Sequence, residues 1–458
     1  MKNPLIAAGL VLFTSFASVA GPKYVFLFIG DGMSTPQRMV TEEFAARIGH
    51  GELAMNRLPY QTNTRTKSAN AVITDSAAAG TAIACGVKTG NGRVGVDMDG
   101  KRLESVAEVA KRTGRKVGII TTVTIVHATP ACFYAHNPNR GRSYQIALDL
   151  IASGFDYFAG GGVYAKYDLK DDPLYRGNVF DLARQAGYTV NREDRAGWAA
   201  LKPGSKSWNV FCDEAMQFAI DADGSQPKLS ELVAKGVEVL DNPNGFFIMC
   251  EGGKVDYACH ANDAATNLRD VLALDDAVKV ALRFQDAHPD DTLVITTGDH
   301  ETGGMSMGFA GIGGKFKVEV LATQKVSTEK FSGDIKRLIW ERHAKIGFDE
   351  VKPIVAERFG LADLTAQEET VLRAAFEKDV RFVRDRVADT TAHDVKRHYV
   401  FAQAVKNALN ARAGIGWSSS SHTALPTFTT AKGPGADILV GMTENSDIGL
   451  RLKGLLER

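Results

Sequence analysis

The chain has 458 residues, of which 44% are hydrophobic and 24% charged, and its 54 basic residues balance its 54 acidic ones to a formal net charge of zero. These values are typical of a globular protein with a substantial core, and they exclude a disordered tail, a collagen-like chain and a disulfide-stapled miniprotein. Nonspecific nucleic-acid binding needs a surplus of basic residues, so no nucleic acid is expected as a specific partner. Any anion-binding feature must therefore be local.

The first twenty residues have the features of an export signal. Lys2 supplies a positive charge, residues 5–16 form an apolar run, and Ser18 and Ala20 place small residues where a signal peptidase reads them. The run is shorter than the about 20 apolar residues that a membrane span needs. We expect residues 1–20 to be a cleaved signal peptide, which predicts a periplasmic or secreted protein without a membrane anchor. An uncleaved anchor is the alternative.

Export permits disulfides, but the five cysteines are an odd number and none forms a CxxC pair. At least one thiol therefore stays free, and zinc-ribbon and thioredoxin-like sites are excluded. We expect several of these cysteines to be small buried hydrophobic residues.

Four short apolar runs that end in polar, glycine-rich turns are the strongest strand candidates. They cover residues 24–29, 116–122, 246–250 and 292–297, and helical stretches such as 102–112 and 262–286 lie between them. Buried strands that alternate with helices predict an α/β fold, a three-layer α/β/α sandwich with a large, mostly parallel central sheet. In such sheets ligands bind beyond the carboxyl ends of the strands.

Residues 304–416 have a different pattern. A glycine-rich entry precedes a helical stretch at 332–345, and a second helix opens with the capping-box pair Thr365 and Glu368. A third helix is expected near 398–411. The second helix has apolar residues at helical spacing, namely Val371, Ala375, Phe376, Val380, Val383 and Val387. We expect an inserted helical subdomain, a lid or dimer contact, within a single domain of residues 21–458.

One candidate metal site centres on Asp256 and His260, which are four residues apart and so share one face of a helix. A carboxylate and an imidazole together suit Zn²⁺, although such a pair alone is more often a salt bridge. Glu251 strengthens the zinc interpretation because it ends the preceding strand beside two glycines.

Further candidate ligands follow other strands. Asp299 and His300 are adjacent after the run at 292–297, and Asp31 follows the first run. The alternative for Asp299 is an Asx turn that caps the loop. His422 lies in a serine-rich loop after the insertion, where a histidine is usually just exposed.

Ser76 is the candidate nucleophile. It precedes a run of small, helix-compatible residues, so it is expected at a helix N-terminus, where backbone N–H groups and the helix dipole favour an anion. The alternative is that Ser76 only caps the helix. No serine-protease-type pattern accompanies it, so activation would have to come from a metal.

Five segments in series resemble the alkaline phosphatases over nearly the whole chain after the signal. They are residues 28–33, 74–78, 251–256, 299–304 and 421–423. The resemblance implies hydrolysis of small phosphate monoesters through a phosphoserine intermediate, favoured at alkaline pH, at a site with two Zn²⁺ and one Mg²⁺. It also implies a homodimer.

The resemblance further implies the ligand sets. Asp256, His260 and His422 would hold the first zinc; Asp31, Asp299, His300 and the reacting Ser76 the second; Asp31, Thr129 and Glu251 the magnesium. The phosphate-binding arginine of the family falls on Arg140, with Arg142 as a close alternative.

Two positions vary within the family. His127 stands where some members carry aspartate, and a nitrogen there can weaken the preference for magnesium. Tyr257 stands where some members carry a basic residue, so phosphate is expected to be held less tightly.

Two other classes of function stay open. One is a phosphodiesterase or sulfatase-like member of the same superfamily, which commonly uses threonine or a modified cysteine where Ser76 stands. The other is a secreted metal- or phosphate-binding protein without turnover, which would need no nucleophile.

Overall fold

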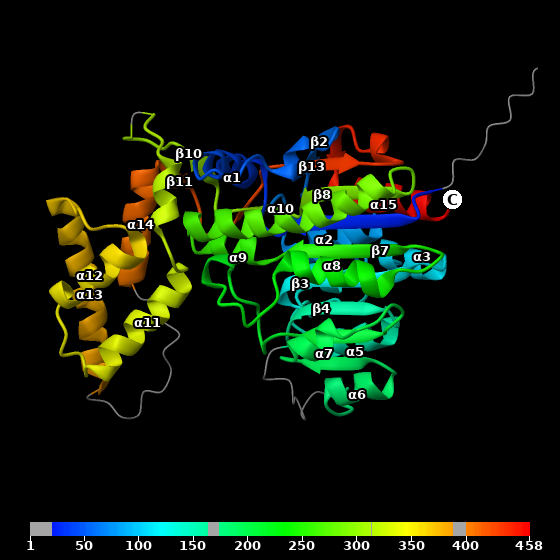
Figure 1. The fold of residues 1–458 in the computed structure, drawn as a ribbon, viewed down its shortest axis with the longest axis horizontal. Coiled ribbons are helices and arrows are strands. Elements are labelled where there is room, and N and C mark those ends of the chain that lie inside the picture. Colours follow the sequence, from blue (N-terminus) through cyan, green and yellow to red (C-terminus); the bar gives the residue numbers. More distant parts are fainter. Residues whose placement is uncertain (1–20, 164–173, 313, 388–399) are drawn as a thin grey trace, which may run out of the picture.

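The computed structural model describes residues 21–163, 174–312, 314–387 and 400–458. The predicted signal peptide, residues 1–20, lies outside the described residues. Residues 21–458 contain a large central sheet with helices against both faces, so the predicted three-layer α/β fold is confirmed (Figure 1).

The central sheet has ten strands. Only β13 runs antiparallel to its two neighbours. Each of the four predicted strands is present, extended by one or two residues at its carboxyl end. In sheet order the strands are β14 (Gly441–Glu444), β2 (Tyr60–Arg65), β13 (Thr427–Lys432), β8 (Thr292–Gly298), β1 (Tyr24–Gly30), β7 (Phe246–Gly252), β3 (Lys116–Thr124), β4 (Tyr157–Gly161), β6 (Ser207–Val210) and β5 (Thr189–Arg192).

The central strands are buried on both faces because their side chains alternate between two hydrophobic cores. Phe26 and Phe28 of β1 point into one core, and Val25, Leu27 and Ile29 point into the other. A strand covered on both faces has no polar side, which explains its continuous apolar run.

The helices divide between these two cores. One core contains α1 (Thr35–Arg47), α7 (Arg195–Ala199), α8 (Leu229–Leu240), α9 (Lys254–His260) and α10 (Ala264–Ala287). The other contains α2 (Ser76–Cys85), α3 (Val106–Arg112), α4 (Ala128–Ala131), α5 (Ser143–Ser153), α6 (Val179–Gln185) and α15 (Asn445–Leu456). Two small antiparallel ladders complete the body: β9 (Glu301–Thr302) with β12 (His422–Thr423), and β10 (Met305–Met307) with β11 (Ile415–Trp417).

The described residues between 304 and 416 include a helical group beside the sheet, coloured yellow to orange in Figure 1. Its helices are α11 (Thr328–Glu341), α12 (Phe348–Phe359), α13 (Ala366–Val387) and α14 (Val400–Ala413). The capping box of α13 is confirmed, since Thr365 Oγ1 accepts from Glu368 N at 3.2 Å. The helix expected at 332–345 begins earlier, because Ser327 caps it by accepting from Lys330 N at 3.0 Å.

Two details of the insertion differ from the sequence prediction. Helix α12 was not predicted, and it contains Pro353 in its interior. On α13, Val371 is 52% exposed, and the buried positions are Leu372, Phe376, Val380 and Val383. The buried face therefore begins at Leu372, one residue later than predicted, and α13 packs against α14, where the Phe376 and Phe401 ring centroids are 5.1 Å apart.

All five cysteines are free thiols, and four of them are buried. This confirms the expectation that several pack as small hydrophobic residues. None of the helices in the described part of the chain has the length and apolar character needed to cross a membrane.

Candidate active site

The parallel register of β8, β1 and β7 brings three carboxylates together. Gly30 pairs with Gly252 of β7 and with Gly298 of β8, so the residues around these strand ends lie at one level of the sheet. Asp31 and Asp299 each follow their strand directly, and Glu251 is the next-to-last residue of β7. All three are fully buried.

Asp256, His260 and His422 form one group of potential metal ligands. Helix α9 places His260 Nε2 3.3 Å from Asp256 Oδ2. His422 comes from the ladder between β12 and β9, and its Nε2 lies 3.9 Å from Asp256 Oδ1. The expected i, i+4 geometry of the first pair is therefore present.

Asp31, Asp299 and His300 form a second group, and Ser76 lies against it. His300 Nε2 is 3.3 Å from Asp31 Oδ1 and 3.2 Å from Asp299 Oδ2. Ser76 Oγ is 3.2 Å from the same nitrogen. Ser76 is the first residue of α2, and the cap itself is Asp75, whose side chain accepts from Ala78 N at 3.0 Å. The interpretation of Ser76 as only a capping residue is therefore wrong.

Asp31, Glu251 and His127 form a third group. His127 Nδ1 lies 3.8 Å from Asp31 Oδ2 and 3.9 Å from Glu251 Oε1. Thr129 Oγ1 donates to Asp31 Oδ2 at 3.4 Å. His127 and Thr129 thus both lie beside the carboxylates that they were expected to accompany.

Each of the second and third groups contains buried polar atoms without a hydrogen-bond partner among the described residues. They are Asp31 Oδ1, Asp299 Oδ2, Glu251 Oε1 and His127 Nδ1. An unsatisfied buried polar atom costs about 1–3 kcal/mol, and more when the group is charged. Divalent cations would satisfy these atoms, so the residues present fit metal binding.

Without cations these carboxylates resist ionisation. Burial, reinforced by the neighbouring acidic groups, holds the pKa of Asp31 and that of Asp299 well above the usual value. Burial raises the pKa of Glu251 to about 7. Burial also lowers the pKa of His127 to about 3, which leaves its imidazole neutral. A neutral imidazole is the form that binds a metal.

Two of the histidines are oriented by their second nitrogen. His260 Nδ1 donates to Ser420 O at 2.7 Å, and His422 Nδ1 donates to Thr74 O at 2.9 Å. Because Nδ1 donates to a backbone carbonyl in each case, Nε2 is the nitrogen that faces Asp256 and that would bind a cation once it has lost its proton. Both rings are therefore prepared to bind a cation through Nε2.

Arg140 is the arginine next to the site. Its Nη1 donates to Asp75 Oδ2 at 3.0 Å, and its Nη2 is 3.3 Å from His127 Nε2. Arg142 is exposed and precedes the first residue of α5. The geometry thus favours Arg140 over the alternative, Arg142.

Three supporting residues were not predicted from the sequence. Asp75 orients Arg140, Thr121 donates to Glu251 Oε2, and Thr302 donates to Asp256 Oδ1 at 2.6 Å. An aspartate directly before the helix was a detectable signal for Asp75. The two threonines carry no local signal, because their partners are distant in the chain.

The insertion contacts the turn that follows His260. Lys406 Nζ of α14 donates to Ala261 O at 2.6 Å, and Asn410 Nδ2 donates to Asn262 O at 2.7 Å. Helix α14 thus holds the turn that directly follows a candidate metal ligand, His260.

A family model described as alkaline phosphatase matches residues 22–171 and 177–457. The chain belongs to the alkaline phosphatase family. It is 31% identical over 442 residues to alkaline phosphatase 4 of Bacillus subtilis, covering 92% of this chain and 86% of that one. The alkaline phosphatase of Schizosaccharomyces pombe is 28% identical, with 93% of this chain and 80% of that one covered.

Solved structures of the family have the same fold. A cold-active alkaline phosphatase from a psychrophilic Shewanella has a TM-score of 0.81 at 26% identity, with coverage of 95% of this chain and 100% of that one. The Thermus thermophilus alkaline phosphatase has a TM-score of 0.78 at 29% identity, with 95% and 91% covered. The chain is thus a metal-dependent phosphatase of this family.

Proposed function

We propose that the chain hydrolyses phosphate monoesters to an alcohol and inorganic phosphate through a phosphoserine on Ser76. The observation that carries the proposal is the position of Ser76 Oγ, 3.2 Å from His300 Nε2. The carboxylates beside that nitrogen, Asp31 and Asp299, have buried oxygens without partners. A buried hydroxyl beside potential metal ligands can be activated as a nucleophile by a bound metal.

We propose that the first two groups hold Zn²⁺ and the third group holds another divalent cation, expected as Mg²⁺. The nitrogen and oxygen donors of the first two groups suit Zn²⁺, and the mostly oxygen donors of the third suit Mg²⁺. Bound cations would lower the pKa of the Ser76 hydroxyl and of water, and would offset the charge of the phosphate.

The residues of the chain then account for two displacements at phosphorus. Ser76 Oγ gives its proton to solvent and attacks phosphorus, the bond to the ester oxygen breaks, and the leaving alkoxide takes a proton from water. A water molecule next gives a proton to solvent and attacks the phosphoserine, the bond between Ser76 Oγ and phosphorus breaks, Ser76 Oγ regains a proton from solvent, and phosphate is released. Arg140 and the N-terminus of α2 hold the nonbridging oxygens, where negative charge accumulates.

A substrate panel tests this proposal. We expect turnover of a chromogenic phosphomonoester at a rate at least about a hundredfold above that of a phosphodiester or a sulfate ester, which corresponds to about 2.7 kcal/mol of transition-state discrimination. Preferred cleavage of the diester or the sulfate would favour the superfamily alternative. Binding of phosphate without any turnover would favour the non-catalytic alternative.

The pH dependence is a second test. Because Ser76 and water must each lose a proton, we expect kcat for a phosphomonoester to rise from pH 6 toward alkaline pH. The measurement is a kcat profile in buffers of constant ionic strength. A profile with its maximum below pH 6 would contradict the mechanism.

Tyr257 is expected to limit the affinity for phosphate. Its ring lies 6.2 Å from the His127 ring, and it cannot supply the positive charge that some family members have at this position. Replacing Tyr257 by lysine is expected to lower the inhibition constant of inorganic phosphate about threefold to tenfold, since an added charge near the anion contributes about 1 kcal/mol. Tyr257→Phe, which adds no charge, is the control. An unchanged inhibition constant in Tyr257→Lys would remove the hypothesis.

His127 is expected to influence whether the third group prefers Mg²⁺ or Zn²⁺. Its Nδ1 faces Asp31 and Glu251, and a nitrogen ligand favours Zn²⁺ over Mg²⁺. A related alkaline phosphatase from the Antarctic bacterium TAB5, with a TM-score of 0.68 at 25% identity, has Mg bound in its M3 site when a histidine is replaced by aspartate. This supports a comparable role for His127.

Replacing His127 by aspartate is expected to raise Mg²⁺ affinity at the third group about tenfold, the size of effect that a change in the ligand environment typically has. The measurement is metal content per chain after dialysis against mixtures of Mg²⁺ and Zn²⁺. The exposed His50→Asp serves as the control. Equal metal ratios in the two variants would rule out this role for His127.

The predicted signal peptide, export and homodimer are not needed for this chemistry and stay predictions, as does a lid role for residues 304–416.

A further inference from the structure

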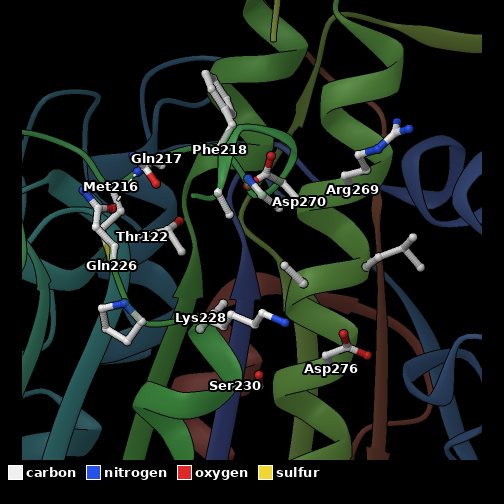
Figure 2. Close-up of a pocket in the computed structure, with 16 residues that line it drawn as sticks. Thr122, Met216, Gln217, Phe218, Gln226, Lys228, Ser230, Arg269, Asp270 and Asp276 are labelled. Carbon is white, nitrogen blue, oxygen red and sulfur yellow. Dashed lines mark hydrogen bonds between the residues drawn. The ribbon is translucent and has the colours of Figure 1, made fainter. Parts of the chain in front are cut away.

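A cavity of about 280 Å³ lies between α8, α10 and the segment 216–228, with Thr122 of β3 in its wall (Figure 2). It is on the face of the sheet opposite to α2 and Ser76. None of the residues of the three potential metal-binding groups lines it. The cavity is therefore distinct from the candidate active site.

Asp270 of α10 is the unusual group in this cavity. It is only 6% exposed, and its Oδ2 has no hydrogen-bond partner among the described residues. Its Oδ1 accepts a long bond of 3.4 Å from Ala219 N. Burial raises the pKa of Asp270 to about 7. A buried carboxylate with an unpaired oxygen is costly unless a donor satisfies it.

Two of the other charged groups nearby are engaged elsewhere, and the charge of a third, Lys254, acts on Asp270 without a hydrogen bond to it among the described residues. The Arg269 guanidinium points away from the cavity in Figure 2 and donates to Ala265 O at 2.9 Å. Asp276 pairs with Lys279 at 2.9 Å. The buried Lys254 ammonium lies over the Phe218 ring, 3.5 Å from its centroid. Lys228 of the wall is exposed, so Asp270 is the buried charged group of the described cavity wall that has an unpartnered oxygen.

The remainder of the wall is mainly apolar. Met216, Phe218, Leu229 and Leu272 line the space around Asp270. An inorganic cation such as Ca²⁺ needs six to eight oxygen ligands, which this wall does not supply. A neutral apolar ligand would leave Asp270 Oδ2 unsatisfied.

We propose that this cavity binds a small organic cation, an ammonium group on an apolar body, with the ammonium donating to Asp270 and the body packed on the apolar wall. Charge-assisted hydrogen bonds are the stronger kind, and a few convergent polar groups in an apolar pocket are typical of small-molecule sites. The inference does not rest on the proposed phosphatase chemistry.

Isothermal titration calorimetry with benzylamine as the probe tests the inference. The metal-loaded protein is saturated with inorganic phosphate, which keeps the active site occupied, and is titrated at pH 8, where the probe is protonated. We expect benzylamine to bind at least about tenfold more tightly than benzyl alcohol, a neutral probe of the same shape. Equal affinities for the two probes, or no saturable binding of benzylamine, would overturn the inference.

Two variants locate the binding. Asp270→Asn is expected to reduce the affinity for benzylamine to that for benzyl alcohol, whereas Asp286→Asn on the same helix, outside the cavity, leaves it unchanged. Ala273→Phe retains Asp270 and fills the cavity, so it is expected to abolish binding of both probes. This variant tests the site independently if Asp270→Asn does not fold. Benzylamine affinity that is unchanged in Ala273→Phe would place the amine elsewhere and overturn the inference.

Discussion

Replacing Ser76 by alanine is expected to lower kcat for a phosphomonoester by about 10⁴-fold or more, because removal of an attacking nucleophile costs this much in comparable hydrolases. Ser76 Oγ is the hydroxyl 3.2 Å from His300 Nε2, at the N-terminus of α2. Alanine keeps the helix, since the cap is the Asp75 side chain and not Ser76. The loss is therefore expected in the chemical step and not in folding.

The measurement is kcat together with metal content and melting temperature. Ser143→Ala is the matched control, because Ser143 is also the first residue of a helix, α5, on the same face of the sheet. It is expected to keep full activity. Undiminished turnover by Ser76→Ala, with normal metal content, would contradict a phosphoserine at this position.

Removing the metals with a chelator is expected to lower activity at least about a thousandfold, since a bound cation supplies several kcal/mol of charge stabilisation. It is also expected to lower the melting temperature by at least about 5 °C, because a ligand that binds only the folded state stabilises it by mass action. The loss of activity and the loss of stability have one cause, because removal of the cations leaves buried oxygens of Asp31, Asp299 and Glu251 without a partner.

The metal-free protein is also expected to lose stability as the pH rises from about 6.5 to 9, the range between the unfolded pKa of histidine and the highest folded pKa involved. The pKa of Glu251 is raised to about 7 by burial, and that of His260 is raised to about 9 by its hydrogen bond with Asp256. Burial also raises the pKa of Asp31 and of Asp299. His260 binds more protons in the folded chain than in the unfolded one across this range, and Glu251 does so up to about pH 7, so raising the pH favours unfolding; the raised pKa values of Asp31 and Asp299 act in the same direction.

The pKa of His127 is lowered to about 3, so below the pKa of an unfolded histidine the folded chain binds fewer protons at this residue than the unfolded chain does. Its effect on stability is therefore opposite in sign but lies below about pH 6.5, outside the range considered. The measurement is the melting temperature of chelated and Zn²⁺-restored protein across pH 6 to 9. The restored protein, whose carboxylates are neutralised by cations, is the control. Activity that resists the chelator would contradict metal binding by these residues, and a chelated protein that is most stable at pH 9 would contradict the raised pKa values.

The strands and the residues at their ends could be predicted from local patterns. A strand buried on both faces must be apolar throughout, so its carboxyl end is marked by the first polar residues, such as Asp31 after β1 and Asp299 after β8. Asp256 and His260 were predictable for a similar reason, because one helical turn places them on one face. These inferences depend only on residues close in sequence.

The insertion shows where local patterns fail. Periodicity indicated a helix at α13 but placed Val371 on its buried face, whereas Leu372 is the buried residue. Neighbouring residues on a helix differ by about 100° in direction, and only the contacts with α11, α12 and α14 select which side is covered. Helix α12 was missed because Pro353 normally interrupts a helix.

By itself, the sequence determined the fold class, the strand ends and the candidate ligands, because strand burial and helical spacing are local properties. Only the tertiary structure decided which distant groups meet: His422 reaches Asp256 through the ladder of β12 with β9, and Arg140 rather than Arg142 reaches Asp75. The neutral net charge did not reveal this pocket either. The folded chain gathers Asp31, Glu251, Asp256 and Asp299 in one buried place, where their mutual repulsion and desolvation create a demand for cations that composition cannot show.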